Sequence, residues 1–393
     1  MTRGDVSCLR FFWGRRVDLF PNRVVIDPSA LAHNLRQVRR VLGDGVGITA
    51  VVKADAYGHG MLGAAKAFLE AGAERLAVAH VAEAVTLREN GLRAPIVVLC
   101  GVRTQDEAAV AISRDLIPVL SDFGPVGLLG RESRRRGQRV RVQLKIDTGM
   151  GRLGVPYTET GSFLDKTLSQ DSLEPEGLVS HLSSADEPER EFTEIQIRRF
   201  AGVLETGRAR GLSLEASSLA NSAGVLWYPE AHLGMVRPGI VLYGGLPSPD
   251  RTSPIPLRPA MTLNARVLQV RDLPGGTPVS YGRTYITPGK IKTAVISAGY
   301  SDGLPRSLSN RGRVLIRGKK VPMVGRVCMN LVMADVTELE DTEPGDEAVF
   351  LGQQGDARIT GDEVAASCGT ISYEIYCTVG QCGVKRTVHE SEA

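Results

Sequence analysis

The sequence predicts an α/β protein in which a (β/α)8 TIM barrel is followed by a mostly β C-terminal domain. Between about residues 28 and 245, eight short apolar runs alternate with amphipathic helical segments, which is the element count of such a barrel. From about residue 255, strand-like runs separated by Pro and Gly turns replace this alternation. The chain has 393 residues, 42% of them hydrophobic, and so has enough apolar material for a core in each part.

The eight predicted barrel strands are rich in β-branched residues. They span residues 46–53, 75–79, 95–100, 116–120, 139–147, 177–182, 212–218 and 235–244. Helical patterns such as MLGAAKAFLEAG lie between them and end at a glycine that suits a helix C-cap. One more helix, SALAHNLRQVRRVL, precedes the first strand. The pattern is weakest for the eighth strand–helix pair, because few residues remain for a helix after Tyr243.

The predicted domain boundaries follow these changes of pattern. Residues 1–23 are interpreted as a leader whose sequence specifies no clear structure. Two explanations stay open, a disordered segment and a start site assigned too far upstream. Residues 24–250 form the barrel, and residues 251–393 form the β domain after a linker-like PSPDRTSPIP. Within the β domain, only GDEVAASCG has a helical pattern.

Charge and cysteine content argue against several function classes. The net charge is +3 with both signs mixed, and RESRRRGQR is best interpreted as a solvated helix end, so no nucleic-acid partner is expected. The six cysteines form no CxxC pair and no histidine lies at zinc-finger spacing from them, so no metal site and a reduced, cytoplasmic protein are expected. The N-terminus has no apolar stretch long enough for a signal peptide or membrane span.

Residues that are mostly polar follow the first predicted barrel strand and the fifth to the eighth. In a barrel, the C-terminal strand ends and their loops form one open face where reactive residues gather. The residues at these positions are Lys53, Lys145, Asp147, Arg152, His181, Ser217, Asn221, Ser222, Arg237 and Gly239. The sequence therefore predicts that they meet at one mouth.

Lys53 ends an apolar strand in the stretch AVVKADAYGHG. In a water-poor barrel mouth its ammonium form is disfavoured, so its neutral amine becomes available to form a Schiff base. A snorkelling or ion-paired lysine is the alternative. The following GHGMLG also matches a dinucleotide-binding fingerprint, but that motif requires an acidic residue at the end of the next strand, where this sequence has His80.

A phosphate site is predicted after the last two barrel strands, where barrels commonly hold phosphate with backbone amides and small hydroxyls. The segment ANSAG supplies the Ser222 hydroxyl, and RPGIVLYG supplies the backbone N–H groups of Gly239 and Ile240. Ordinary turns and a helix N-cap are the alternative interpretation of these two segments.

Nine blocks of the sequence resemble the alanine racemases, pyridoxal 5'-phosphate (PLP) enzymes of the barrel fold type III. In chain order they are AVVKADAYGHG, KIDTGMGRLG, SHLSSADE, LANSAG, VRPGIVLYG, VSYGRTY, SAGYSDGLPR, VGRVCMN and ISYEIYC. The resemblance implies an isomerase that interconverts L-alanine and D-alanine and supplies D-alanine for peptidoglycan. It also implies a cytoplasmic homodimer whose active site is shared across subunits.

The resemblance implies roles for individual residues around the cofactor. Lys53 would be the PLP Schiff-base lysine and one acid/base, and Tyr281 of the partner subunit would be the other. Arg237 would face the pyridine nitrogen, with His181 behind it. The residues that would hold the phosphate, or otherwise contact the cofactor, are Tyr57, Asn221, Ser222, Gly239, Ile240 and Tyr373.

Four further residues would act around the substrate. Arg152 would contact the cofactor phenolate oxygen and the substrate, Met329 would meet the substrate carboxylate through its backbone, and Tyr300 would narrow the entrance. Lys145 would be the lysine that some family members carry as a carbamate pressing on Arg152. Asn330 departs from the family's usual Asp and is expected to alter this neighbourhood. The C-terminal CGVKRTVHE also departs from the family's usual arginine-proline-arginine ending.

These roles agree with the chemistry of racemisation. The α-proton must leave from one face and return on the other, so two bases on opposite sides are required. A tyrosine can be one of them if nearby cations lower its pKa from about 10. An arginine opposite the pyridine nitrogen keeps its own proton, so the ring nitrogen stays unprotonated, the electron sink is weakened, and side reactions such as transamination are limited.

Three alternatives stay open at this point. A racemase of broader or different specificity, acting on serine, lysine or arginine, would carry the same motifs. A non-enzymatic PLP-binding barrel protein would have no reason to contain Tyr281, Met329 and Tyr373. A PLP decarboxylase would not carry the VSYG and CMN blocks in its C-terminal domain.

Overall fold

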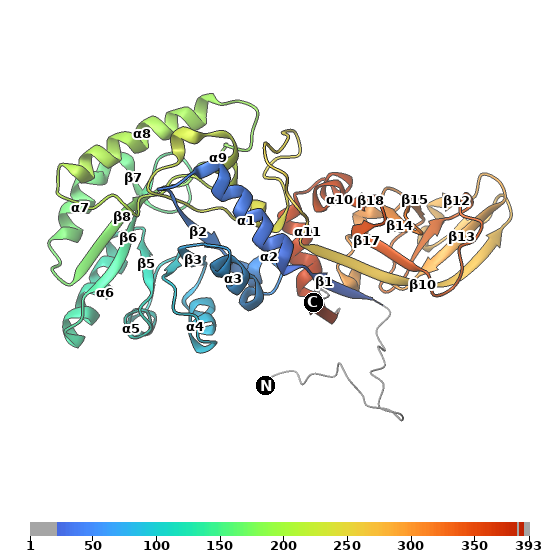
Figure 1. The fold of residues 1–393 in the computed structure, drawn as a ribbon, viewed down its shortest axis with the longest axis horizontal. Coiled ribbons are helices and arrows are strands. Elements are labelled where there is room, and N and C mark those ends of the chain that lie inside the picture. The colour runs from blue at the N-terminus through green and yellow to red at the C-terminus, as the bar shows by residue number, and fades with distance from the viewer. Residues whose placement is uncertain (1–21, 383–384, 389–393) are drawn as a thin grey trace. The chain divides into compact units, whose positions relative to one another are not determined.

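The computed structural model describes residues 22–382 and 385–388 (Figure 1). The chain forms two compact units, one made by residues 29–258 and the other by the described parts of residues 1–28 and 259–393. We call them the barrel unit and the β unit. The leader predicted for residues 1–23 lies outside the described residues except for Asn22 and Arg23.

The barrel unit contains a closed ring of parallel strands. Its strands are β2 (Gly47–Val51), β3 (Arg75–Val78), β4 (Ile96–Val98), β5 (Ile117–Leu120), β6 (Val140–Asp147), β8 (Leu173–Val179) and β9 (Met235–Val236), with the short β7 (Val155–Pro156) beside β6. Each strand from β2 to β8 pairs in parallel with the next, apart from β7, and β9 pairs with β2. Ser218 bridges Val179 to Met235 and so closes the ring. This closure confirms the predicted barrel.

Helices surround these strands (Figure 1). They are α1 (Pro28–Leu42), α3 (Met61–Glu70), α4 (Val81–Glu89), α5 (Gln105–Ser113), α6 (Phe123–Arg136), α7 (Thr160–Leu168), α8 (Glu191–Arg208) and α9 (Ser222–Trp227). The element labelled α2 (Lys53–Tyr57) is a short left-handed turn and not a right-handed helix. Three short 3-10 helices, η1 (Tyr157–Glu159), η2 (Pro229–Ala231) and η3 (Ile240–Tyr243), complete the unit. The core is made by fully buried strand residues such as Ile48, Leu76 and Val97.

The last two predicted barrel strands are much shorter than the sequence suggests. In the run 212–218, Ser217 donates its N–H to Leu214 O and closes a turn, so only Ser218 is left to bridge the neighbouring strands. In the run 235–244, the strand ends at Val236 ahead of Pro238, which has no N–H for a ladder. The chain then enters η3 instead of a full helix.

The β unit is built on a nine-stranded sheet. Its strands are β1 (Arg23–Ile26), β10 (Met261–Leu273), β13 (Ile291–Ile296), β14 (Arg313–Ile316), β15 (Lys319–Val324), β16 (Val332–Asp335), β17 (Glu347–Gln354), β18 (Ala357–Ile359) and β19 (Lys385–Val388). Strand β10 pairs with both β13 and β17, which closes a circuit through β14, β15 and β16. A small hairpin of β11 (Pro278–Val279) and β12 (Tyr285–Ile286) stands apart from this sheet.

Two features of the β unit differ from the sequence prediction. Helix α10 (Gly361–Cys368) was expected, but α11 (Ser372–Gln381) was not, because its β-branched and aromatic residues favour a strand. Ile375 and Val379, four residues apart, are both buried, so tertiary packing stabilises the helix. Residues 24–26, predicted to begin the barrel, instead form β1 and pair antiparallel with β10.

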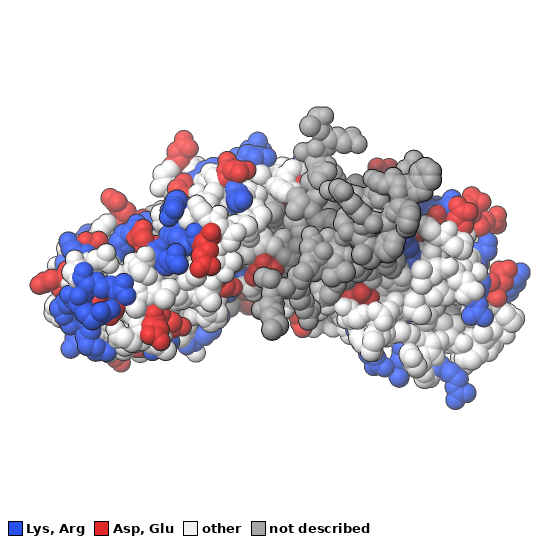
Figure 2. Space-filling model, turned by 90° about the horizontal axis from the view of Figure 1, so that it is seen from below, with Lys and Arg blue, Asp and Glu red and all other residues white. Residues whose placement is uncertain are grey.

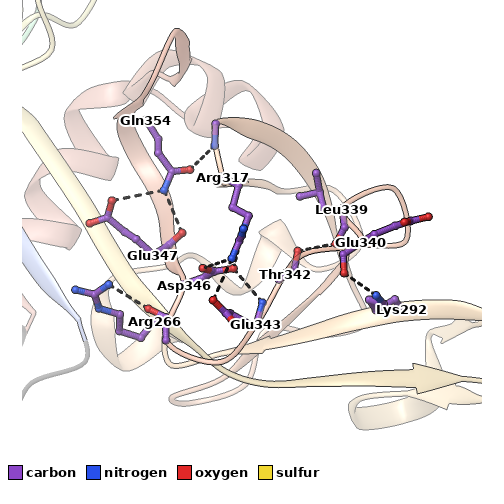
Figure 3. Close-up of polar contacts among 12 residues, drawn as sticks. Arg266, Lys292, Arg317, Leu339, Glu340, Thr342, Glu343, Asp346, Glu347 and Gln354 are labelled. Carbon is purple, nitrogen blue, oxygen red and sulfur yellow. Dashed lines mark hydrogen bonds and ion pairs between the residues drawn. The ribbon is translucent and has the colours of Figure 1, made fainter.

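Polar contacts hold the β14–β15 turn to the loop before β17 (Figure 3). Arg317 lies in this turn, and its guanidinium pairs with Asp346 at 2.7 Å and Glu343 at 3.3 Å. Hydrogen bonds from Arg317 are the main cause that lowers the pKa of Asp346. Gln354 accepts a hydrogen bond from Gly318 N at 2.8 Å. These contacts fix one end of the unit, although exposed pairs of this kind each contribute only about 0–1 kcal/mol.

The surface carries both signs of charge. Figure 2 shows basic and acidic side chains interspersed over the described residues of one face. The basic segment predicted to be a helix end is the last turn of α6, where Arg135 and Arg136 pair with Glu132. Among the described residues, no helix is both long and apolar enough to cross a membrane.

Candidate active site

Lys53 stands at the start of an unusual turn at the end of β2. Val52 still donates its N–H to Ala77 O of the neighbouring strand region, and Lys53 follows, half-buried. The next four residues, Ala54 to Tyr57, have φ between 53° and 55°, so the chain winds in a left-handed turn. This conformation costs L-residues roughly 1–2 kcal/mol each. Strain of this kind persists only where surrounding contacts hold it, and it is concentrated at functional sites.

Tyr57 connects this turn to the predicted phosphate segment. Its ring is buried and lies 4.9 Å from the ring of Tyr243, centroid to centroid. Its hydroxyl reaches the backbone at Gly239 so closely that a Cβ there would lie 2.3 Å from Tyr57 Oη. Lack of space for a side chain therefore explains the glycine at position 239. The backbone conformation does not explain it, because its φ of −122° is open to any residue.

The two predicted phosphate segments are joined to each other. Asn221 is the N-cap of α9, with its Oδ1 accepting from Gly224 N at 3.0 Å, so the alternative interpretation of this residue as a helix cap also holds. The buried Ser222 hydroxyl accepts from Gly239 N at 2.9 Å and from Val241 N at 3.5 Å. The structure thus brings Tyr57, Ser222 and Gly239 together, with Ile240 next in the chain.

Arg237 has an open hydrogen-bonding position. Its side chain is buried, and Nη2 donates to Ser180 O at 2.5 Å and to Leu219 O at 3.4 Å. Its Nη1 has no hydrogen-bond partner within the described residues. Burial lowers the pKa of Arg237 to about 10, so the guanidinium stays charged near neutral pH. A buried charged donor without a partner is costly, which indicates that an acceptor binds there.

Lys53, Lys145, Arg152 and Arg237 form a cationic cluster that acts on His181. Burial lowers the pKa of Lys145 to about 7, with further lowering by Arg237 and then Arg152 and an opposing effect of Asp147. Burial also lowers the pKa of His181 well below its ordinary value, followed by the charges of all four cations, so this imidazole is neutral at neutral pH. So much positive charge in one place favours an anionic ligand.

Asp147 organises the loop that carries Arg152. Its Oδ1 accepts from Gly149 N at 2.8 Å and Met150 N at 2.7 Å, and its Oδ2 accepts from Gly151 N at 2.8 Å. Sequence reasoning noted Asp147 only as a strand-end residue, although an Asp followed by two closely spaced glycines is a signal for such a turn. Ser217, also a strand-end candidate, accepts from Leu178 N at 3.0 Å and so belongs to the barrel wall.

The predicted residues of the β unit lie on adjoining loops. Tyr300 N donates to Cys328 O at 3.0 Å, immediately before Met329. Ser280, next to Tyr281, donates from Oγ to Arg326 O at 2.7 Å. Tyr281, Tyr300 and Met329 are exposed, with 69%, 43% and 56% of their surface accessible.

Three further features complete this part of the β unit. Tyr373 is half-buried in the first turn of α11. Asn330 donates from Nδ2 to Ser301 Oγ at 2.6 Å, a bond that an ionised Asp at this position could not donate. A hollow of about 470 Å³ beside Tyr281 is lined by residues of the hairpin and of β10, β13 and β16.

Two family models match nearly the whole chain. The N-terminal domain of alanine racemase matches residues 26–247, and the C-terminal domain of alanine racemase matches residues 260–388. The chain belongs to the alanine racemase family. This confirms the resemblance inferred from the nine blocks, and the family comprises PLP-dependent isomerases.

Relatives and solved structures agree with this membership. The chain is 44% identical over 358 residues to the alanine racemase of Syntrophobacter fumaroxidans, covering 91% of this chain and 95% of that one. It is 41% identical over 367 residues to alanine racemase 2 of Caldanaerobacter subterraneus subsp. tengcongensis, covering 93% and 94%. The crystal structure of alanine racemase from Streptomyces lavendulae superposes with a TM-score of 0.88 at 34% identity, covering 95% and 98%.

A substitution at Gly239 tests the close approach between Tyr57 and the backbone. Gly239→Ala is expected to weaken PLP binding by about tenfold or more, because the new Cβ overlaps the Tyr57 hydroxyl. The dissociation constant is measured by titrating PLP against the apoprotein and following absorbance. Gly63→Ala is the control, because Gly63 lies exposed in α3 with open space at its Cβ. Equal PLP affinity in the two variants would contradict the expected role of position 239.

Proposed function

We propose that this family member interconverts L-alanine and D-alanine with PLP bound at the barrel mouth, using Lys53 and Tyr281 as its two acid/base groups. The proposal is based on three features that occur together at the mouth of the barrel unit. A lysine begins a strained turn there, this lysine belongs to a cationic cluster, and the buried Arg237 Nη1 has no partner among the described residues. Family membership supplies the reaction class.

The residues at the mouth fit PLP. The phosphate would be bound by Tyr57, Ser222 and the backbone N–H groups of Gly239 and Ile240. Gly239 N would then donate to the phosphate instead of to Ser222 Oγ. Arg237 Nη1 would donate to the pyridine nitrogen. Asn221 and Tyr373 are proposed as further cofactor contacts. Lys53 Nζ would bind the cofactor covalently.

The cofactor, when bound, supplies an electron sink for the charge left on the substrate Cα. The chain supplies the proton transfers, since Lys53 Nζ and Tyr281 Oη take and return the α-proton on opposite faces. Arg237 stays protonated because its pKa of about 10 lies well above neutral pH. It would therefore donate a hydrogen bond to the ring nitrogen without transferring a proton, which would moderate the electron sink and limit side reactions. His181, neutral at this pH, would lie behind Arg237.

Three further residues are proposed to recognise the substrate. Arg152 would contact the cofactor phenolate oxygen and the substrate, the backbone of Met329 would bind the substrate carboxylate, and Tyr300 would limit the width of the entrance. The exposed apolar side chains of the β unit support a homodimer in which Tyr281 of the partner subunit completes each site. We place this dimer in the cytoplasm, where it would supply D-alanine for peptidoglycan.

Lys145 is proposed to carry a carbamate that presses on Arg152. Carbamylation requires the neutral amine, and a pKa of about 7 makes this form abundant at neutral pH. Because the neutral fraction rises as pH increases through about 7, the modified fraction is expected to rise over the same range. In protein equilibrated with ¹³C-bicarbonate, a carbamate ¹³C signal is expected, and Lys145→Ala should lose it while Lys166→Ala, a helix-surface control, keeps it. A signal unchanged in Lys145→Ala would contradict the assignment.

The substrate range decides between this proposal and a racemase of broader specificity. The PLP-loaded protein is incubated with L- or D-alanine and with serine, lysine and arginine, and the loss of optical activity is followed by circular dichroism. Alanine is expected to be the best substrate, and equal turnover of lysine or arginine would favour the broader racemase. A non-enzymatic barrel protein or a decarboxylase does not account for the match of residues 260–388 to the racemase C-terminal domain.

A further inference from the structure

The carboxylate of Glu83 joins two neighbouring loops of the barrel unit. Its Oε2 accepts from Ala79 N at 2.7 Å and from His80 N at 3.0 Å, which is the ordinary capping of the start of α4. Its Oε1 accepts from Ala54 N at 2.7 Å. One side chain therefore connects the start of α4 to the residue that follows Lys53 in the chain.

The turn that begins at Ala54 needs such a restraint. Its residues from Ala54 to Tyr57 are all L-residues in the left-handed region, which right-handed or extended conformations would relieve. Within the turn, Ala56 N bonds to Val52 O and Gly58 N bonds to Ala54 O, but the N–H of Ala54 is taken by Glu83. At the other end, Asp55 Oδ1 accepts from Met61 N at 2.6 Å. The turn is thus held at both ends by carboxylates.

Glu83 reaches from one strand-end loop to the next. Strands β2 and β3 pair in parallel with Val51 opposite Ala77, so the loops after them are neighbours. Glu83 lies in the first turn of α4, which follows β3, and its carboxylate spans from the start of this helix to the loop after β2. A charged acceptor gives a stronger hydrogen bond to a backbone N–H than a neutral one does.

We propose that Glu83 is a positioning residue for Lys53: by holding the N–H of Ala54 it fixes the left-handed turn and so sets the direction of the lysine side chain. The proposal rests on the proposed function in one respect, that Lys53 is the cofactor lysine. Reactive groups lose much of their effect when they are displaced by as little as about 1 Å, so loss of this hydrogen bond has a functional consequence beyond helix stability.

The chain contains a matched control in the next helix. Glu107, at the start of α5, accepts from Arg103 N at 2.6 Å and from Thr104 N at 3.2 Å through Oε2. Among the described residues its carboxylate makes no other hydrogen bond or ion pair. Glu83→Gln removes the charge from both a helix cap and the bond to Ala54, whereas Glu107→Gln removes it from a helix cap alone.

The experiment compares Glu83→Gln, Glu107→Gln and the unchanged chain as full-length protein. Hydrogen–deuterium exchange is measured over residues 53–60 without PLP, and PLP affinity is measured by absorbance. Glu83→Gln is expected to speed exchange in this segment and to weaken PLP binding, each by about tenfold, which corresponds to about 1.4 kcal/mol. Glu107→Gln is expected to change neither, while both variants lower the thermal midpoint by similar small amounts.

Two outcomes would overturn the proposal. One is exchange over residues 53–60 that is equal in the two variants, because Glu83 would then be only a helix cap. The other is faster exchange in Glu83→Gln with unchanged PLP affinity, because the turn would then not position the lysine. Failure of the proposed function is recognised separately: Lys53→Ala would bind PLP as the unchanged chain does, whatever the exchange of this segment in Glu83→Gln.

Discussion

Replacing Lys53 with alanine is expected to abolish the absorption band of covalently bound PLP and to lower racemisation of alanine by about 10³-fold or more. The substitution removes both the amine that binds the cofactor and one of the two proton-transfer groups, and a single acid/base group alone contributes about 10²–10⁴-fold. The measurements are the absorption spectrum of the purified protein and the rate of racemisation by circular dichroism.

The matched control for Lys53→Ala is Lys66→Ala. Lys66 is exposed on α3, in the same segment of the barrel, and removal of its charge should leave both the spectrum and the rate unchanged. If Lys53→Ala keeps the covalent PLP band and full turnover, Lys53 is not the cofactor lysine, and the role proposed for the left-handed turn fails with it.

Replacing Tyr281 with phenylalanine is expected to leave the PLP band intact but to lower racemisation in both directions by about 10²–10⁴-fold. Both directions must fall together, because L- and D-alanine are equally stable and one missing base interrupts the same path. Lys53 remains, so exchange of the α-hydrogen with deuterated solvent should persist for one enantiomer and be lost for the other. Proton NMR of alanine incubated in heavy water measures this difference. Exchange of both enantiomers at the original rate would contradict the role of Tyr281.

A mixed dimer provides a second test of Tyr281. If each site combines Lys53 of one subunit with Tyr281 of the other, a dimer of one Lys53→Ala chain and one Tyr281→Phe chain contains one unaltered site. Co-expression of the two inactive variants should then restore activity, whereas a site made within one chain would give none. Tyr157→Phe is the control for loss of a hydroxyl from an exposed tyrosine ring.

Much of the fold follows from local patterns in the sequence. Strand positions in the barrel unit are set by short β-branched runs, and helix ends by residues such as the Thr104 N-cap and the glycine after α6. The predictions fail where long-range packing decides the result. Helix α11 forms although its residues favour a strand, because Ile375 and Val379 are buried on one side of it. Strand β1 joins the β unit because it pairs with β10, more than 230 residues later.

The candidate site shows the same division. Strand ends and family motifs predict that Lys53, Lys145, Arg152, His181 and Arg237 lie at one face. The sequence could not reveal that Glu83 bonds to Ala54, because a capping glutamate has the same local pattern whether or not a second loop lies within reach. It also could not reveal the open Nη1 of Arg237, which depends on which carbonyl oxygens the barrel wall presents.

By itself, the sequence determined the barrel and the β domain, the family, and the residue types available for racemisation. These depend on periodicity and on motifs, which are properties of neighbouring residues along the chain. Tertiary structure alone decided the left-handed turn after Lys53, the ring closure through Ser218 and the fit of Tyr57 against Gly239. Each of these depends on contacts between segments that are distant in sequence. Such contacts can hold a backbone conformation that local preference opposes.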